Sequence, residues 1–204
     1  MKVVAFNGSP KKHGNTYLLL KEVQKKLGEE DIETEIVHIG GKEVIGCTAC
    51  MKCFENKDEK CVLEKDFVND AIIRMKEADG IIIASPTYFA DVTTETKALI
   101  DRAGFVGLAN DGMFSRKVGA AVVTARRGGA IHTYDTINHL FGISNMITVG
   151  SSYWNVGFGL EPGDVEKDEE GFETMRNLAS NMAWILKKIH AGETEVKKDS
   201  TAVD

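Results

Sequence analysis

Short apolar segments alternate with longer segments of helical periodicity along almost the whole chain, and this alternation limits the fold more than any other feature. Strand-like runs rich in β-branched or small apolar residues are found at 2–6, 32–39, 80–84, 117–124 and 146–149. Helical spacing follows at 15–27, 66–77, 93–105, 129–141 and 168–189. Strands that alternate with helices predict a parallel sheet covered by helices on both faces.

The chain length suits one domain with an insertion. The 204 residues are enough to bury a substantial core. We predict a single domain over 1–190, and within it a cysteine-rich loop at 40–65 that shows no clean period. The polar segment 191–204 is predicted to be a tail, either disordered or exchanged with another subunit.

Charge and hydropathy exclude several classes of partner. The formal net charge is -6, which argues against non-specific binding to nucleic acid. The sequence has no apolar stretch of membrane-spanning length, and the apolar part of its N-terminus is too short for a secretory signal. We therefore expect a cytoplasmic protein without a membrane or nucleic-acid partner.

A turn-rich loop, GSPKKHGNT at 8–16, follows the first predicted strand and opens a helix. Backbone amides at such a helix start, together with the helix dipole, form an anion site. The loop lacks the Gly-Lys-Ser/Thr ending of a P-loop and the GxGxxG of dinucleotide sites, so we predict a different kind of phosphate site. An ordinary polar loop capped by Asn15 is the alternative. The predicted phosphate contacts are Ser9, Lys11, Gly14, Asn15 and Thr16.

Three segments together resemble the flavin loops of NADPH-dependent FMN reductases and of iron–sulfur flavoproteins. They are GSP-x-x-x-GNT, then SPTYF at 85–89 with the helix-like TTETKALIDR at 93–102, and TARRGG at 124–129. Each follows a predicted strand, where parallel sheets bind their ligands. The resemblance covers roughly 1–190 and implies an FMN-binding flavodoxin-like fold. This is a three-layer sandwich with five parallel strands in the order 2-1-3-4-5.

The second and third loops are the candidate pocket for the flavin ring, which needs a flat and partly apolar slot. Aromatic walls contribute about 0.5–1.5 kcal/mol beyond burial, and an arginine near the ring stabilises its reduced anion. Core aromatics and solvated arginines are the alternatives. Tyr153 and Trp154 are expected to pack structurally rather than contact the cofactor. The predicted ring contacts are Pro86, Thr87, Tyr88, Phe89, Thr124, Arg126, Arg127 and Gly128.

All four cysteines lie in one short stretch with the spacing C-x2-C-x2-C-x7-C: Cys47, Cys50, Cys53 and Cys61. Four thiolates suit a tetrahedral zinc ion or a [4Fe–4S] cluster. Three cysteines at successive x2 spacing are typical of the ferredoxin run, whereas zinc sites usually present two separated pairs. The spacing therefore favours the cluster, and zinc or no metal remain open.

The string GCTACMKC resembles the compact cysteine motif of iron–sulfur flavoproteins, which implies a [4Fe–4S] cluster near the flavin. The resemblance further implies an FMN-dependent oxidoreductase, with no catalytic residues beyond its cofactors. A ferredoxin-type donor would supply electrons for oxygen, peroxide or a quinone. It also implies a homodimer or homotetramer. One alternative is an NAD(P)H-dependent FMN or quinone reductase with a structural or zinc-binding loop, and another is a non-enzymatic flavodoxin-like binding protein.

Overall fold

Six parallel strands form one sheet in the computed structural model, which describes the backbone of residues 1–200 and the side chains of residues 1–192. The strands are β1 (Lys2–Asn7), β2 (Glu33–His38), β3 (Gly80–Pro86), β4 (Val118–Ala125), β5 (Ile147–Thr148) and β6 (Val156–Phe158). Their main order is β2-β1-β3-β4-β5, and β6 also pairs with β4. The predicted flavodoxin-like order 2-1-3-4-5 is confirmed.

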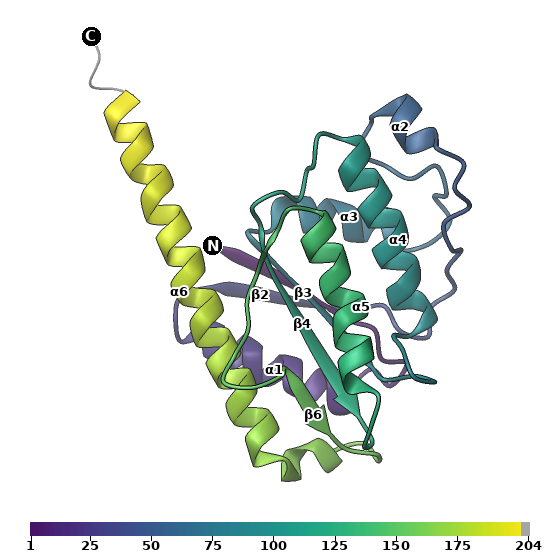
Figure 1. Cartoon of the computed structure of the whole chain (residues 1–204), viewed down its shortest axis with the longest axis vertical. Helices are drawn as coiled ribbons and strands as arrows, with labels where there is room; N and C mark the ends of the chain where they lie inside the picture. The colour runs from purple at the N-terminus through teal and green to yellow at the C-terminus, as the bar shows by residue number, and fades with distance from the viewer. Residues whose placement is uncertain (201–204) are drawn as a thin grey trace.

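Helices cover both faces of the sheet, so the molecule has three layers (Figure 1). They are α1 (Asn15–Gly28), α2 (Lys52–Asn56), α3 (Val68–Glu77), α4 (Thr94–Ala109), α5 (Ala130–Ile143), the 3-10 helix η1 (Asp164–Lys167) and α6 (Glu169–Ser200). One core lies between the sheet and α3, α4 and α5. The other lies between the sheet and α1 and α6.

The central strands explain why the chain adopts this arrangement. In β3, Ile81 and Ile83 enter one core, and Ile82 and Ala84 enter the other. Side chains alternate between the faces of a strand, so a continuous apolar run is required when both faces are covered. Each fully buried isoleucine contributes about 1.5–3 kcal/mol relative to an exposed one.

The fifth predicted strand, 146–149, is shorter than expected, and a sixth strand that was not predicted follows it. The short β5 pairs only with Val118 and Gly119 of β4, and β6 pairs with Val123, Thr124 and Ala125 at the other end of the same strand. The sequence analysis missed β6 because three residues are too few to show a period. It also missed α2, a short helix inside the cysteine loop.

The C-terminal helix is longer than predicted. It continues past the expected end at Ile189 to Ser200, so of the two alternatives for the tail, the disordered one is wrong for 191–200. Residues 201–204 of that predicted tail lie outside the described residues. The tail was predicted from its missing apolar periodicity, which does not by itself prevent a helix. Within the described part, no helix has the length and hydropathy to cross a membrane.

Candidate functional site

The three loops singled out in the sequence lie side by side at the carboxyl edge of the sheet. The Gly8 amide donates to the carbonyl of Ala84 at 2.8 Å, and the Thr93 hydroxyl donates to the carbonyl of Gly8 at 2.9 Å. The Thr87 amide donates to the carbonyl of Thr124 at 2.7 Å. These bonds join the loops after β1, β3 and β4, where a parallel sheet of this order binds ligands.

The loop after β1 is held as a series of tight turns. The Ser9 amide donates to Oδ1 of Asn7 at 3.0 Å, and the Lys11 amide donates to Oγ of Ser9 at 3.2 Å. Gly14 is the N-cap residue of α1, and no side chain among the described residues caps the helix there. The first amides of α1 therefore lack a capping acceptor, and with the helix dipole they suit a phosphate group.

Close backbone packing fixes the position of the loop after β1. A Cβ atom on Gly40 would lie 2.2 Å from the carbonyl carbon and oxygen of Ser9. A Cβ on Gly8 would lie 2.0 Å from Oγ1 of Thr96. Nε2 of His38 is also hydrogen-bonded to the carbonyl of Ser9 at 2.8 Å. The end of β2 and the start of α4 thus set the position of the phosphate loop, and only glycine fits at two of the contacts.

Two of the predicted phosphate ligands have protein partners instead. Nδ2 of Asn15 donates to the carbonyl of Glu161 at 2.9 Å, and its Oδ1 accepts from the Gly163 amide at 2.8 Å. The hydroxyl of Thr16 is bonded to that of Thr124 at 2.7 Å. Asn15 therefore joins α1 to the loop before η1, and Thr16 joins α1 to β4. The backbone of the loop, rather than these side chains, is the better phosphate site.

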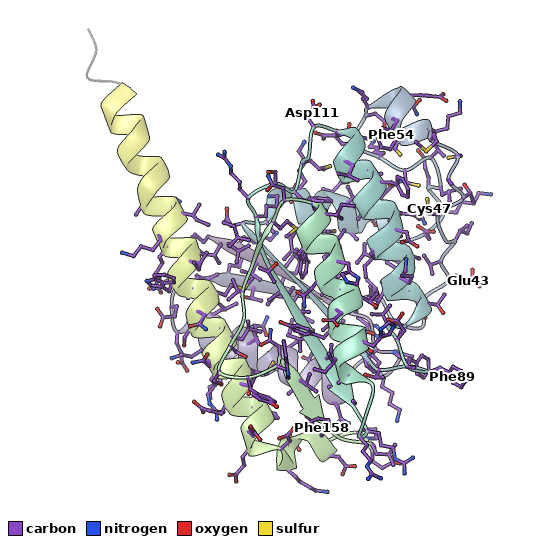
Figure 2. All side chains as sticks on the ribbon, in the orientation of Figure 1. Glu43, Cys47, Phe54, Phe89, Asp111 and Phe158 are labelled. Atoms are coloured by element: carbon purple, nitrogen blue, oxygen red, sulfur yellow. The ribbon has the colours of Figure 1, made fainter. Side chains whose placement is uncertain are left out.

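The loop after β3 presents its aromatic residues to solvent. Tyr88 and Phe89 are exposed, and Phe89 points away from the body of the protein (Figure 2). The alternative that they are core aromatics is therefore wrong. The Thr87 and Tyr88 amides already donate to protein carbonyls, so they are not free to bind a flavin ring. Phe89 and Ala90 have φ of 48° and 74°, a strained conformation that is concentrated at functional loops.

The loop after β4 packs against the loop after β3. A Cβ on Gly129, whose φ is 85°, would lie 3.1 Å from Cγ2 of Thr87. Arg126 and Arg127 are exposed beside this contact. A hollow next to it includes Arg127, Tyr153 and Trp154 in its lining. Tyr153 is exposed, whereas the half-exposed ring of Trp154 packs edge-on against that of Tyr134, with the ring centroids 5.6 Å apart. The expected structural packing is therefore found for Trp154 and not for Tyr153.

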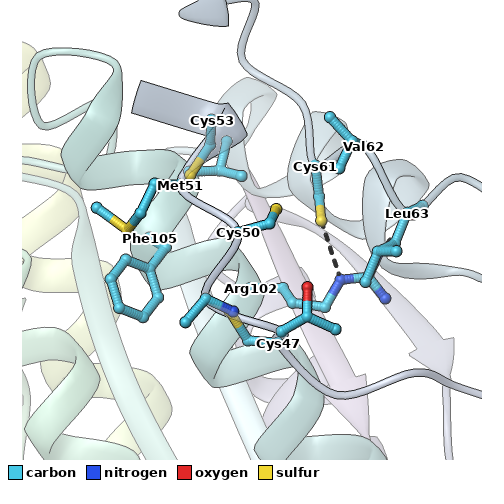
Figure 3. A pocket seen from close by; sticks show the side chains of 12 residues that line it. Cys47, Cys50, Met51, Cys53, Cys61, Val62, Leu63, Arg102 and Phe105 are labelled. Carbon is cyan, nitrogen blue, oxygen red and sulfur yellow. Dashed lines mark hydrogen bonds between the residues drawn. The ribbon is translucent and has the colours of Figure 1, made fainter. Parts of the chain in front are cut away.

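The four cysteines surround one hollow between the cysteine loop and α4 (Figure 3). All four are free thiols. On the side of α4 the lining is formed by the apolar Phe105 and Val106 and by the charged Arg102. Four thiol groups around a shared space are the donor set of a zinc or iron–sulfur site.

Backbone strain shapes this loop around Cys50. Its neighbours Ala49 and Met51 have φ of 51° and 58°, and each left-handed residue other than glycine costs about 1–2 kcal/mol. A hydrogen bond from the Lys52 amide lowers the pKa of the Cys50 thiol, whereas burial raises the pKa of the Cys53 thiol. The thiolate is the form that binds metals, so the lowered pKa favours the metal-binding form of Cys50.

Two kinds of metal site use four cysteine thiolates. In the described part of the chain, no three Cys, His, Asp or Glu side chains are grouped so that they could hold a single metal ion. A tetrahedral zinc ion needs four donors about 2.3 Å from one point, whereas a cube accepts one thiolate at each of four separate corners. Both kinds of site use four thiolates, and the four cysteines around the hollow supply that number.

Arg102 of α4 is a site residue that the sequence analysis missed. Its side chain is 0% exposed, and it forms an ion pair with Asp66, which is 4% exposed. Its Nε donates to Sγ of Cys61 at 3.3 Å. Arg102 lies three residues after Leu99 and four before Val106, both buried. A charged residue on the apolar face of a predicted helix was the signal available in the sequence.

Comparisons with known proteins agree with this geometry. The profile of a family described as NADPH-dependent FMN reductase matches residues 1–161. The chain is 39% identical to an iron-sulfur flavoprotein of Methanocaldococcus jannaschii over 196 residues, covering 93% of this chain and 99% of that protein. It is 31% identical to an iron-sulfur flavoprotein of Methanosarcina thermophila over 191 residues, covering 93% and 97%. A WrbA-like flavodoxin of Agrobacterium tumefaciens aligns with a TM-score of 0.64 at 15% identity, covering 92% and 97%.

Proposed function

This chain belongs to the NADPH-dependent FMN reductase family and is an FMN-dependent oxidoreductase, and from that premise we propose that its cysteine loop holds a [4Fe–4S] cluster. The observation that carries the proposal is the set of four free cysteines around one hollow. Relatives named iron-sulfur flavoproteins that align over nearly the whole chain support it. The ligands are Cys47, Cys50, Cys53 and Cys61.

The three loops at the carboxyl edge of the sheet hold the FMN. The amides of the first turn of α1 bind the phosphate, and the loops after β3 and β4 hold the ring. Arg126 and Arg127 supply positive charge beside it. When bound, FMN exchanges one or two electrons, and the cluster exchanges one. Met51 and Phe105 line the cysteine hollow and limit the access of water to it.

A ferredoxin-type protein is the proposed electron donor, and oxygen, peroxide or a quinone is the proposed acceptor. The surface of the cysteine loop is mixed in charge. Its exposed lysines, Lys52, Lys57, Lys60 and Lys65, lie among acidic residues, and Lys52 is paired with Glu55. Attraction between an acidic donor and these lysines therefore does not by itself account for docking of the donor.

We expect reduced ferredoxin to bleach the flavin absorbance at least about tenfold faster than NADPH does, because a cluster accepts single electrons and not hydride. Anaerobic stopped-flow absorbance with matched concentrations of each donor measures the two rates. Faster bleaching by NADPH would favour the alternative reductase, in which the cysteine loop is structural.

We also propose that the protein is a homodimer or homotetramer and is located in the cytoplasm. Phe89 is fully exposed at the tip of the loop after β3, and a subunit interface over the flavin, in a homodimer or homotetramer, would cover it. Four free thiols suit the reducing cytoplasm.

The cluster itself is tested by anaerobic reconstitution with iron and sulfide. We expect about four irons and four sulfides per chain, with broad visible absorbance beneath the flavin bands. Cys47→Ala removes one corner ligand, so it is expected to lose most of the iron while it keeps FMN. Val62→Ala is the matched control, because Val62 lines the same hollow without a sulfur.

The outcomes separate the proposal from its alternatives. Full iron content in Cys47→Ala would show that the ligand set is wrong. A protein that takes up stoichiometric zinc in place of iron would support a zinc-binding loop, and a colourless one without FMN would support the non-enzymatic alternative.

A further inference from the structure

The guanidinium of Arg102 is buried at the floor of the cysteine hollow (Figure 3). Besides its bond to Sγ of Cys61, it donates to the carbonyl of Ile45 at 3.0 Å and to the carboxylate of Asp66. It also donates to the carbonyl of Leu63. All of these partners belong to the cysteine loop or to its two ends, so one side chain of α4 contacts the loop on both sides of the cysteines.

Asp66 completes the connection between the two ends of the loop. Its Oδ2 accepts from the Ile45 amide at 3.2 Å, and its Oδ1 accepts from the Val68 amide at 3.1 Å. The pair therefore joins the segment before Cys47 to the start of α3. A buried ion pair whose remaining hydrogen bonds are satisfied holds its neighbours in one arrangement.

Cys61 is held through both its main chain and its sulfur. Its amide donates to Oδ1 of Asn69 at 2.9 Å, and its carbonyl accepts from Nδ2 of the same residue at 2.8 Å. Its sulfur accepts from Arg102 at 3.3 Å. By contrast, Cys50 is exposed and lies between two left-handed residues. Main chain and sulfur of Cys61 are thus both fixed by the helical scaffold.

We propose that Arg102 is a positioning residue that presets Cys61 as the fixed corner of the cysteine site and raises the reduction potential of the cluster bound there. The inference rests on the proposed function, and it adds a residue outside the ligand set. A hydrogen bond from a charged donor to a ligand sulfur strengthens as the cluster gains negative charge. The reduced state is therefore stabilised more than the oxidised state.

Two substitutions distinguish a residue that tunes the reduction potential of the cluster from one that only attaches the cysteine loop to α4. Arg102→Lys keeps the positive charge beside Asp66 but removes the Nε–H donor and the planar fork. Asp66→Asn keeps the Arg102 donor to Cys61 and removes a negative charge near the site. If Arg102 only attaches the loop, the two variants loosen the same contacts and change the potential in the same direction. If Arg102 tunes the cluster, the changes differ in sign.

The first measurement is an anaerobic redox titration of the reconstituted full chain, followed by electron paramagnetic resonance. We expect Arg102→Lys to lower the equilibrium constant for cluster reduction by about tenfold, equivalent to about 59 mV for one electron. Asp66→Asn is expected to raise it, because a negative charge near the cluster is removed. An unchanged potential in Arg102→Lys, or a fall of equal size in both variants, would overturn the tuning role.

The second measurement needs no iron. In the reduced, metal-free protein, we expect iodoacetamide to label Cys61 at least about tenfold more slowly than Cys50, since a fixed thiol is less accessible. Arg102→Lys is expected to remove most of this difference in peptide mass spectra. Equal labelling in the wild type would refute the positioning role. If the wild type takes up no iron, the cluster and its tuning are both refuted, and labelling still decides whether Arg102 fixes Cys61.

Discussion

Gly40→Ala will lose at least about a hundredfold in FMN affinity, equivalent to roughly 2.8 kcal/mol. The new Cβ would lie 2.2 Å from the carbonyl carbon and oxygen of Ser9 and 2.6 Å from the carbonyl oxygen of Gly8. These are backbone atoms, which cannot rotate away as a side chain does. The phosphate loop must therefore move, and its amides leave the positions that bind the phosphate.

Flavin fluorescence titration and denaturant unfolding of the apoprotein together check this result. The substitution is expected to lower the free energy of unfolding by about 1–3 kcal/mol or more, as overpacking does. Gly28→Ala is the control, because nothing lies within 4 Å of a Cβ built there. It should change unfolding by no more than about 0.5 kcal/mol. Wild-type FMN affinity in Gly40→Ala would show that this loop does not hold the cofactor.

Arg102→Met will lower the free energy of unfolding by about 3–5 kcal/mol, because it leaves the Asp66 carboxylate buried without its partner. Arg176→Met is the matched control. Arg176 pairs with Glu22 and Glu173 at the surface, with 40% of its side chain exposed, so its loss should cost only about 0–1 kcal/mol. Urea unfolding of the metal-free protein at neutral pH measures both, and equal effects would contradict the buried pair.

The Arg102–Asp66 pair also predicts how the difference in unfolding free energy between the wild type and Arg102→Met depends on pH. Burial acts to raise the pKa of Asp66, but hydrogen bonds from Arg102 and from the amides of Ile45 and Val68 hold that pKa below its usual range. A lowered folded pKa gives stability that is present above the unfolded value, about 3.9. That stability is lost as the pH falls through the folded pKa. Without Arg102 the pKa of Asp66 is higher than in the wild type, because burial then acts against fewer hydrogen bonds. The gap in unfolding free energy between wild type and Arg102→Met should therefore begin to narrow as Asp66 of the variant is protonated, and narrow further as the pH falls through the lowered wild-type pKa.

Much of the fold was predictable because the sheet is buried on both faces. Strands β3 and β4 consist almost wholly of buried residues, so their apolar runs stand out from the helical periods around them. The positions of the three loops at the sheet edge followed from the same alternation. The short β6 and the C-terminal end of α6 could not be predicted in this way, because three residues show no period and a polar helix end has no apolar stripe.

The candidate site divides along similar lines. The four cysteines are close in the sequence, so their spacing alone predicted a shared site, and the loop after β1 was recognisable by its turn residues. The roles of Asn15 and Arg102 were not predictable, since Asn15 bonds a residue 146 positions away and Arg102 bonds a cysteine 41 positions away. Local patterns indicate that a side chain is buried or polar. They do not identify the distant atom that it meets.

The sequence by itself determined the parallel sheet, the turn-rich loop that ends β1 and the set of four thiols, because each is encoded within a few consecutive residues. Tertiary structure alone decided that Gly40 packs beneath the phosphate loop and that Arg102 lies against Cys61. Both contacts join elements that are far apart in the chain. They depend on how the elements pack against one another in the tertiary structure, which no local period specifies.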